Sequence, residues 1–463
     1  MLVFSSVARN YFLIILLAST LAGCFGATIK SESPSAEITL SANESDQFTF
    51  SVTGPEGADI LYVWSSIENS TFQPKDLTLL QEGVNQSLNY TVDANFESVH
   101  YVEVVCELQK MTDSGDWETK DTVTWEIKSQ MSTQTDPWDR HVFVRNQNDV
   151  DAMEGITKVQ GDLVIDNISF DAYDVLGGIT EINGDLVIVD NPGLKSISDL
   201  GLVNLEEPVS RLVVRNNDAL TTLTGLETIQ YVTQDVHVRG NAKLESLSGL
   251  EGIEVIRQSL YVTDNSRLVS FEGLDNLQEL NFTFWVSDND ILRDFSGLDN
   301  LSTMQAINLH IYSNPNLVSF SGLGGFVEIS GFNLSRNNLL ESFAGLDNLE
   351  YIGGWAHVYY NSGLRSFSGL DKLYTVHSEF NVVGNNNLTS FFGLGNLEFI
   401  AGDMWVTKNE MLLSVEALQR LSRVAGDLTF EGNANLCTSS VETLVEDIEL
   451  IEGGVKLTNN KDC

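Results

Sequence analysis

The feature that most constrains this chain is a repeat of about 24 residues that fills its C-terminal two thirds. An asparagine marks each repeat, at steps of 23 to 27 residues: Asn191, Asn217, Asn241, Asn265, Asn289, Asn314, Asn337, Asn361, Asn385, Asn409, Asn433 and Asn460. A fixed period of this size is typical of a solenoid, in which each coil buries its apolar residues only against neighbouring coils. The repeat therefore predicts the architecture and favours a binding role, but it does not identify a ligand.

Each repeat has two halves. The first, as at 364–370, reads Leu-x-Ser-Phe-x-Gly-Leu, and its glycine turns the chain where a side chain would obstruct. The second, as at 185–189, alternates like a strand with its leucine and isoleucine side chains inward. The asparagine that follows is expected to bond neighbouring backbone in a tight turn, so that stacked copies form an internal ladder. Phenylalanines at equivalent places are expected to stack as a buried column rather than to line a ligand channel: Phe271, Phe295, Phe320, Phe343, Phe367 and Phe391.

The pattern Gly-x-Leu-x-Ile/Val-x-x-Asn, as at 184–191 and, with Met404 in place of leucine, at 402–409, resembles leucine-rich repeats and, more closely, the receptor L domains of the insulin and epidermal growth factor receptors. The resemblance covers residues 141–463. The cysteine-bracketed end at 435–463 looks like those of fungal cell-wall and bacterial surface members. The resemblance implies a right-handed parallel β-solenoid whose broad faces bind partners. This array is longer and poorer in cysteine than receptor L domains, so growth-factor binding is not carried over.

Residues 1–23 look like an export signal, with Arg9 before a short apolar run at 11–18 that is shorter than a membrane-spanning helix. The segment ends in Leu21-Ala22-Gly23-Cys24, which resembles the lipobox of bacterial lipoproteins. That resemblance implies that Cys24 becomes the first mature residue and carries the lipid anchor. Phe25 after it favours the outer membrane or cell surface of a bacterium. The alternative is an ordinary signal peptide with a chance cysteine.

The remaining sequence before the repeats suggests a tether, a small domain and a linker. Residues 24–35 read as a lipidated tether, and 36–128 hold several strand-like runs separated by turns. With Trp64 and Cys106 at core-like positions, these runs resemble an immunoglobulin-like β-sandwich that lacks the usual second cysteine. A polar linker at 129–140 leads to the solenoid at 141–463. The expected fold class is therefore all-β, a small sandwich followed by a solenoid with terminal capping helices at 149–153 and from a capping box at 439–442.

The cysteines and the charge narrow the compartment and the partners. Cys437 and Cys463 bracket the C-terminal segment and are predicted to form a disulfide in an oxidising compartment, whereas Cys106 is expected to be an unpaired buried thiol. The chain carries 65 acidic and 25 basic residues, a net charge of −40. Such a surface repels nucleic-acid backbones and anionic membranes. It suits a protein that lives in salt or among divalent cations, although general solubility is the simpler explanation.

The residue four positions before each ladder asparagine is expected to face outward, and these residues should form one row. The row reads Val187, Val213, His237, Tyr261, Trp285, His310, Asn333, His357, Asn381, Trp405, Thr429 and Lys456. Coils stack about 4.8 Å apart, so residues 237–405 would span roughly 35 Å. With flanking outward residues, the candidate binding face comprises His237, Tyr261, Trp285, His310, Tyr312, Trp355, His357, Tyr359 and Trp405. Exposed rings with amide and imidazole groups suit stacking on sugars or anchoring of a protein partner. The alternative is that cross-coil aromatic pairs only stabilise the sheet.

These observations predict a lipid-anchored binding or adhesion protein of the bacterial cell envelope, with a glycan or protein ligand, a membrane contact through its lipid, and no cofactor, metal or nucleic acid. His310 and His357 lie two coils apart, about 10 Å, which is too far to share a metal without bridging ligands. A polysaccharide lyase or hydrolase with a β-helix fold is the enzyme alternative. Such enzymes need clustered acids or bases, whereas Asp185, Asp235, Asp403 and Asp427 are many coils apart. No catalytic residues are therefore predicted, and a structural envelope role stays open.

Overall fold

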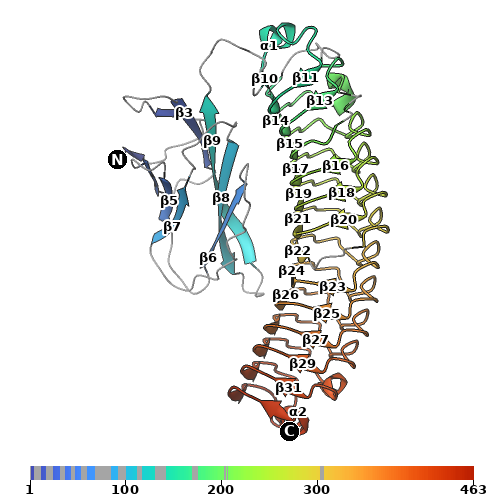
Figure 1. The fold of residues 1–463 in the computed structure, drawn as a ribbon. Helices are drawn as coiled ribbons and strands as arrows, with labels where there is room; N and C mark the ends of the chain where they lie inside the picture. Colours follow the sequence, from blue (N-terminus) through green and yellow to red (C-terminus); the bar gives the residue numbers. More distant parts are fainter. Residues whose placement is uncertain are drawn as a thin grey trace. The chain divides into compact units, whose positions relative to one another are not determined.

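The computed structural model describes residues 142–168, 176–202, 205, 207–302 and 307–463, together with the backbone of strands between Leu2 and Gln130. The chain divides into two compact units, Met1–Pro137 and Trp138–Cys463. The division falls within the linker predicted at 129–140. Nearly all of the regular structure is strand, as expected for an all-β chain (Figure 1).

The first unit contains two antiparallel sheets. One has the order β1 (Leu2–Phe4), β4 (Glu37–Ala42), β5 (Gln47–Thr53) and β7 (Asn85–Thr91). The other has the order β2 (Phe12–Leu16), β3 (Cys24–Ser31), β9 (Trp117–Gln130), β8 (Tyr101–Met111) and β6 (Ile60–Ile67). The register places Trp64 opposite Cys106. Cys24–Ser31 pairs with β9, where the sequence suggested a tether. The side chains of this unit lie outside the described residues, so the immunoglobulin-like core and the buried Cys106 stay predictions.

The second unit is a parallel β-solenoid of about 13 turns with about 24 residues in each coil. Its long sheet has fourteen parallel strands in chain order. They are β10 (Val142–Val144), β12 (Leu163–Asp166), β14 (Leu186–Val189), β15 (Leu212–Arg215), β17 (Val236–Arg239), β19 (Leu260–Thr263), β21 (Thr283–Ser287), β22 (Asn308–Tyr312), β24 (Gly331–Ser335), β26 (Ala356–Tyr359), β28 (Phe380–Val383), β30 (Met404–Thr407), β32 (Leu428–Glu431) and β34 (Val455–Thr458). The long sheet lies on the concave side of this curved unit (Figure 1).

Short two-residue strands form a second wall of the coils. They are grouped as β11 (Lys158–Val159) and β13 (Glu181–Ile182); β16 (Tyr231–Val232), β18 (Val255–Ile256) and β20 (Glu279–Leu280); and β23 (Glu328–Ile329), β25 (Tyr351–Ile352), β27 (Thr375–Val376), β29 (Phe399–Ile400), β31 (Arg423–Val424) and β33 (Leu450–Ile451). Two 3-10 turns, Ile197–Leu200 and Glu416–Leu418, lie in the remaining part of their coils. The long sheet and this second wall enclose one continuous apolar core between them.

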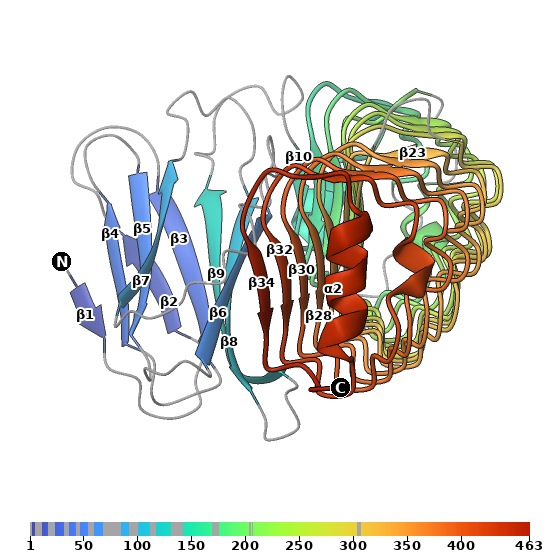
Figure 2. The ribbon, with the colours of Figure 1, turned by 90° about the horizontal axis from the view of Figure 1, so that it is seen from below.

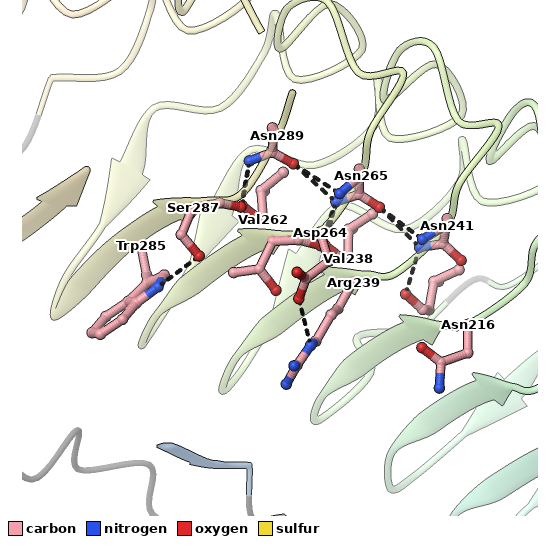
Figure 3. Close-up of polar contacts among 12 residues, drawn as sticks. Asn216, Val238, Arg239, Asn241, Val262, Asp264, Asn265, Trp285, Ser287 and Asn289 are labelled. Carbon is pink, nitrogen blue, oxygen red and sulfur yellow. Dashed lines mark hydrogen bonds and ion pairs between the residues drawn. The ribbon is translucent and has the colours of Figure 1, made fainter. Parts of the chain in front are cut away.

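The asparagine ladder predicted from the repeat is confirmed. At Asn337 the backbone N–H donates to Asn361 Oδ1 at 3.0 Å, and Nδ2 donates to the Ile311 carbonyl of the preceding coil at 2.9 Å. The same bonds recur along the array; Figure 3 shows them at Asn241 and Asn265, and at Asn289 it shows the bond from Nδ2 to the Val262 carbonyl. The residue before most of these asparagines has a positive φ, near 55° at Tyr360. Each asparagine therefore closes a left-handed turn and joins three coils.

The phenylalanine column is also confirmed as core packing. Phe320, Phe343 and Phe367 stack with ring centroids 5.8 and 5.2 Å apart, and each is 0% exposed. The glycine two residues after each phenylalanine sits where the coils approach closely: a Cβ on Gly345, at φ +106°, would lie 2.3 Å from the Phe320 carbonyl carbon. Glycine is required there by both the backbone angle and the space.

Both predicted terminal helices are present. Helix α1 (Gln147–Asp151) has its N-cap at Asn146 and buries Val150, and α2 (Thr438–Asp447) buries Val441 and Leu444 at the C-terminal end of the array (Figure 2). The capping box predicted at 439–442 is wrong: α2 begins at Thr438 with Cys437 as its N-cap and no side-chain cap bond. The Thr438 N–H instead donates to the Lys461 carbonyl at 2.9 Å. The helix thus starts two residues earlier than the predicted box implies. That the helices close the solenoid ends stays a prediction.

The predicted disulfide joins Cys437 to Cys463 across 26 residues. It encloses α2 together with β33 and β34, which pair with β31 and β32 as the last strands of the two sheets. Closing a loop of this size contributes about 3 kcal/mol in the loop-entropy description. The bridge therefore secures the final coil, where fewer neighbours hold the chain.

Candidate functional site

The outward residues aligned from the sequence lie in one row of the long sheet. Strand pairing sets Val213, His237, Tyr261, Trp285, His310, Asn333, His357, Asn381 and Trp405 directly beside one another in that order. Tyr312 and Tyr359 follow the row by two residues on β22 and β26, and Trp355 precedes it immediately before β26. The period of the repeat thus brings residues as much as 168 positions apart onto one surface (237 to 405).

Six of the candidate rings form one connected cluster, which we call the concave aromatic cluster: Trp285, His310, Tyr312, Trp355, His357 and Tyr359. Trp285 stacks on His310 with 4.6 Å between ring centroids and meets the edge of Tyr312 at 5.2 Å. His310 lies 5.4 Å from Trp355, which stacks on His357 at 5.0 Å. His357 in turn stacks on Tyr359 at 5.1 Å. The cluster spans the coils from β21 to β26.

Trp355 reaches His310 because the coil between them carries a glycine. A Cβ on Gly331 would lie 2.8 Å from Trp355 Cε2 and 2.8 Å from Asn308 Oδ1, too close for any other residue without a shift. The indole therefore lies across β24 and bridges two coils. The sequence alignment did not single out Gly331, although a glycine in an outward strand position signals a close approach of another group.

The other candidates lie outside this cluster. His237 and Tyr261 stack face to face, with ring centroids 4.5 Å apart and planes 8° from parallel. Trp405 pairs in register with Asn381 on one side and Thr429 on the other. It is the most exposed of the nine candidates, at 46%. The candidate face is therefore an aromatic pair, a cluster and an isolated tryptophan rather than one even strip.

The expectation that all of these rings are exposed is wrong. His237, Tyr261, Trp285 and His310 keep 2, 6, 7 and 9% of their surface accessible, whereas Tyr312, Trp355, His357 and Tyr359 are partly exposed. Ring-on-ring packing between coils covers a face of each of the four buried rings. The accessible part of the candidate face thus runs from Tyr312 to Trp405.

Burial also sets the charge state of the cluster. Desolvation, with a smaller contribution from His357, lowers the pKa of His310 to about 4, so its imidazole is neutral at pH 7. Burial raises the pKa of Tyr359 to about 12, and its phenol stays protonated. Tyr359 Oη accepts a hydrogen bond from Asn381 Nδ2 at 3.3 Å. The cluster therefore presents neutral rings and a phenol, without a formal charge from these two residues.

Three polar atoms beside these rings have no hydrogen-bond partner among the residues that the structure describes. They are His310 Nδ1, Asn333 Oδ1 and Asn381 Oδ1. Each belongs to the outward row, and Asn333 and Asn381 flank His357 in register. A buried acceptor without a partner carries a cost of about 1–3 kcal/mol. The sequence alignment already placed both asparagines in the outward row. The structure adds that their carbonyl oxygens have no partner among the described residues, so each could accept a hydrogen bond from a ligand.

The aspartates weighed as catalytic acids bond neighbouring coils instead. Asp235 Oδ1 accepts from the Ser259 N–H at 3.0 Å, Asp403 Oδ1 from Asp427 N–H at 2.7 Å, and Asp427 Oδ1 from Gly454 N–H at 2.7 Å. Asp185 pairs with Arg211, whose Nη1 is 3.3 Å from Asp185 Oδ2. Burial raises the pKa of Asp185 to about 7 despite that arginine. Hydrogen bonds or an ion pair between coils account for all four carboxylates.

Comparison with protein-family models, with curated proteins and with solved structures finds no match for this chain. Among the described residues, no cluster of three histidine, cysteine, aspartate or glutamate side chains is arranged to hold a metal ion. No helix in the described part of the chain has the length and hydropathy to cross a bilayer. The function is therefore inferred from the chemistry of the site itself.

Proposed function

We propose that this protein is a lipid-anchored binding or adhesion protein of the bacterial cell envelope. Its ligand, a glycan or a protein, would bind on the concave face of the solenoid, where the concave aromatic cluster and Trp405 lie. The observation that carries the proposal is the run of ring contacts from Trp285 through Trp355 to Tyr359 on an outward sheet face. Core packing does not require tryptophan, histidine and tyrosine at outward positions.

The chemistry of this face suits a ligand with both apolar faces and hydrogen-bond donors. The partly exposed Trp355 and Tyr359 supply ring surfaces, and the amide oxygens of Asn333 and Asn381 are acceptors without partners in the described residues. Sugar rings and the aromatic or amide side chains of a protein meet these requirements. The net charge of −40 disfavours polyanionic ligands. Attachment through Cys24 would hold this face at the surface of a cell.

Binding to immobilised neutral polysaccharides and to whole cells tests the proposal. The variant carries Trp355→Ala with Trp405→Ala, because both side chains are accessible and their loss leaves the core intact. Phe392→Ala is the matched control, since Phe392 is 61% exposed and lies outside the long sheet. We expect the double variant to lose binding by at least about tenfold and the control to bind normally. Equal binding by wild type and double variant on every surface would remove the concave face from consideration.

The anchor has a separate test. Cells that express the chain are labelled with a radioactive fatty acid, with Cys24→Ser as the variant and Cys106→Ser as the control. We expect label in the wild type and in the control, and none in the Cys24→Ser protein. Label that persists in Cys24→Ser would contradict the lipoprotein part of the proposal and leave the binding face untouched.

A further inference from the structure

A second group of aromatic residues lies on the short-strand wall, away from the long sheet. We call it the short-sheet patch: Tyr351, Tyr374, His377, Phe399 and Arg423. Tyr351 lies 6.5 Å from Tyr374 and 4.8 Å from His377, and His377 lies 5.7 Å from Phe399, measured between ring centroids. Tyr374 is 45% exposed, and His377 and Arg423 are also exposed. None of these residues was among the candidates chosen from the sequence.

One end of this patch already holds a cation. The Arg423 guanidinium carbon lies 5.2 Å from the centroid of the Phe399 ring, and Arg423 Nε donates to Glu452 Oε1 at 3.1 Å. A ring face and a carboxylate together bind this guanidinium. Attraction to the electron-rich ring face and to the carboxylate explains the arrangement.

The neighbouring coils also bring a ring and carboxylates together, but no basic side chain among the described residues is paired with those carboxylates. Tyr374 lies between Glu350 and Glu398 in a backbone ladder, since Tyr374 N–H donates to Glu350 O at 3.0 Å and Glu398 N–H donates to Tyr374 O at 2.8 Å. Both glutamates are exposed, and neither forms an ion pair with a residue that the structure describes. The rings beside them are tilted by 51° and 52°, so they enclose a corner rather than forming a flat platform.

A buried hydroxyl lies at the centre of the patch. Thr375 pairs in register with Tyr351 on one side and Phe399 on the other, so its side chain is on the outward side of the short sheet. It is only 4% exposed, and its Oγ1 has no hydrogen-bond partner in the described part of the chain. An unsatisfied buried hydroxyl costs stability. It is an acceptor in register between two aromatic residues, Tyr351 and Phe399, and an N–H donor would satisfy it.

We propose that the short-sheet patch binds an arginine side chain of a partner polypeptide. The guanidinium would lie against Tyr374 and Tyr351, near Glu350 and Glu398 on the adjacent coils, and donate to Thr375 Oγ1 once the side chains that cover this hydroxyl move aside. The site would thus reproduce, with an arginine of the partner, the kind of contacts that Arg423 makes two coils away. The net charge of −40 favours a basic partner at this surface. This site is separate from the concave face.

Fluorescence anisotropy with an end-blocked peptide of alternating arginine and glycine tests the proposal at physiological ionic strength. A peptide with glutamine in place of arginine is the ligand control. We expect Tyr374→Ala to weaken binding of the arginine peptide by about tenfold. Tyr231→Ala is the protein control, because Tyr231 is a comparably exposed tyrosine, 38% exposed, on short strand β16, outside the patch. It should bind within about twofold of wild type.

Thr375→Val separates a binding role from a structural one. Valine has the shape of threonine without the unsatisfied hydroxyl, so the variant should melt at the same temperature or higher. If Thr375 accepts from the ligand, the same variant should bind the arginine peptide about threefold more weakly. Wild-type affinity in both Tyr374→Ala and Thr375→Val would overturn the proposal. An equal loss in Tyr231→Ala would do so too, because the effect of removing a tyrosine would then not be specific to the short-sheet patch.

Discussion

The interior of the solenoid and the outer row of the long sheet follow opposite rules. In the core, each coil carries the same residue as the coil before it: an asparagine in the ladder and, in the middle coils, a phenylalanine in the column. On the outer row the residue changes from coil to coil, from Val213 through Tyr261 and His357 to Lys456. The interior positions and the outer row share one register. The difference in how much their residues vary therefore comes from what each side chain contacts.

The comparison separates residues that build the solenoid from residues that can recognise something. An inner position must match the same residue one coil above and below, because an asparagine donates to an asparagine and a ring stacks on a ring. An outer position has no such constraint, and its identity is free to suit a ligand. Substitutions on the two sides should therefore differ in kind: inner ones lower stability, and accessible outer ones change binding.

The largest expected loss of stability follows from Asn337→Ala. The change leaves the Asn314 N–H and the Ile311 carbonyl without their partner in the core. We expect the free energy of unfolding to fall by about 4 kcal/mol, from two unsatisfied buried groups. Chemical denaturation measures it, with Asn338→Ala, an exposed neighbour, as control. A loss in Asn337→Ala as small as in the control would mean that the ladder is not what holds the coils together.

Phe343→Ala should be nearly as damaging. Its ring is fully buried between Phe320 and Phe367, and removal leaves a cavity in the column. The expected loss is about 4 kcal/mol, whereas Phe392→Ala, at a site that is 61% exposed, should cost under about 0.5 kcal/mol. Thermal unfolding followed by circular dichroism compares the pair. Similar melting temperatures for both variants would break the distinction between inner and outer positions.

His310 belongs to the outward row but is buried, so its protonation should affect stability. Its pKa is about 4 in the folded protein and near 6.5 when unfolded, so only the unfolded chain takes up a proton between these values. The stability contributed by the neutral imidazole is complete above pH 6.5 and falls as pH decreases to about 4, by about 3 kcal/mol. In His310→Gln this part of the pH dependence should be missing. Denaturation of both proteins across this range measures it, and parallel curves would contradict the assignment.

Trp405→Ala should have the smallest effect on stability. The side chain is 46% exposed, and we expect the free energy of unfolding to change by less than about 1 kcal/mol. If the proposed function is correct, the same variant loses ligand affinity. Unfolding and binding measured on one preparation separate a binding role from a structural one. A large loss of stability would place Trp405 with the inner residues.

The period of the repeat was enough to predict the solenoid, the ladder, the phenylalanine column and the outward row, because each depends only on register. It could not predict how the rings lie. Trp355 crosses Gly331 to reach His310, and that contact depends on side-chain direction and on the missing Cβ one coil away. For the same reason the burial of Trp285 was not foreseen.

The short-strand wall was missed for a different reason. A strand such as Tyr351–Ile352 has two residues, too few to show an alternating pattern. Its signal is visible only across repeats, where Tyr351, Thr375, Phe399 and Arg423 recur at steps of 24 residues before an inward aliphatic residue. The inter-coil bonds of Asp403 and Asp427 were likewise hidden, since a single repeat does not show which backbone amide a carboxylate will meet.

The asparagine ladder has a consequence for how this protein can change in length. Each asparagine offers its donors and its acceptor to identical groups on either side. Excising one whole unit, or duplicating one, would rejoin equivalent partners and leave the hydrogen bonding intact. A cut of any other size would misalign the ladder. The length of the solenoid can thus change in steps of one coil. Each coil removed or added would also bring the surface residues on either side of it closer together or move them farther apart.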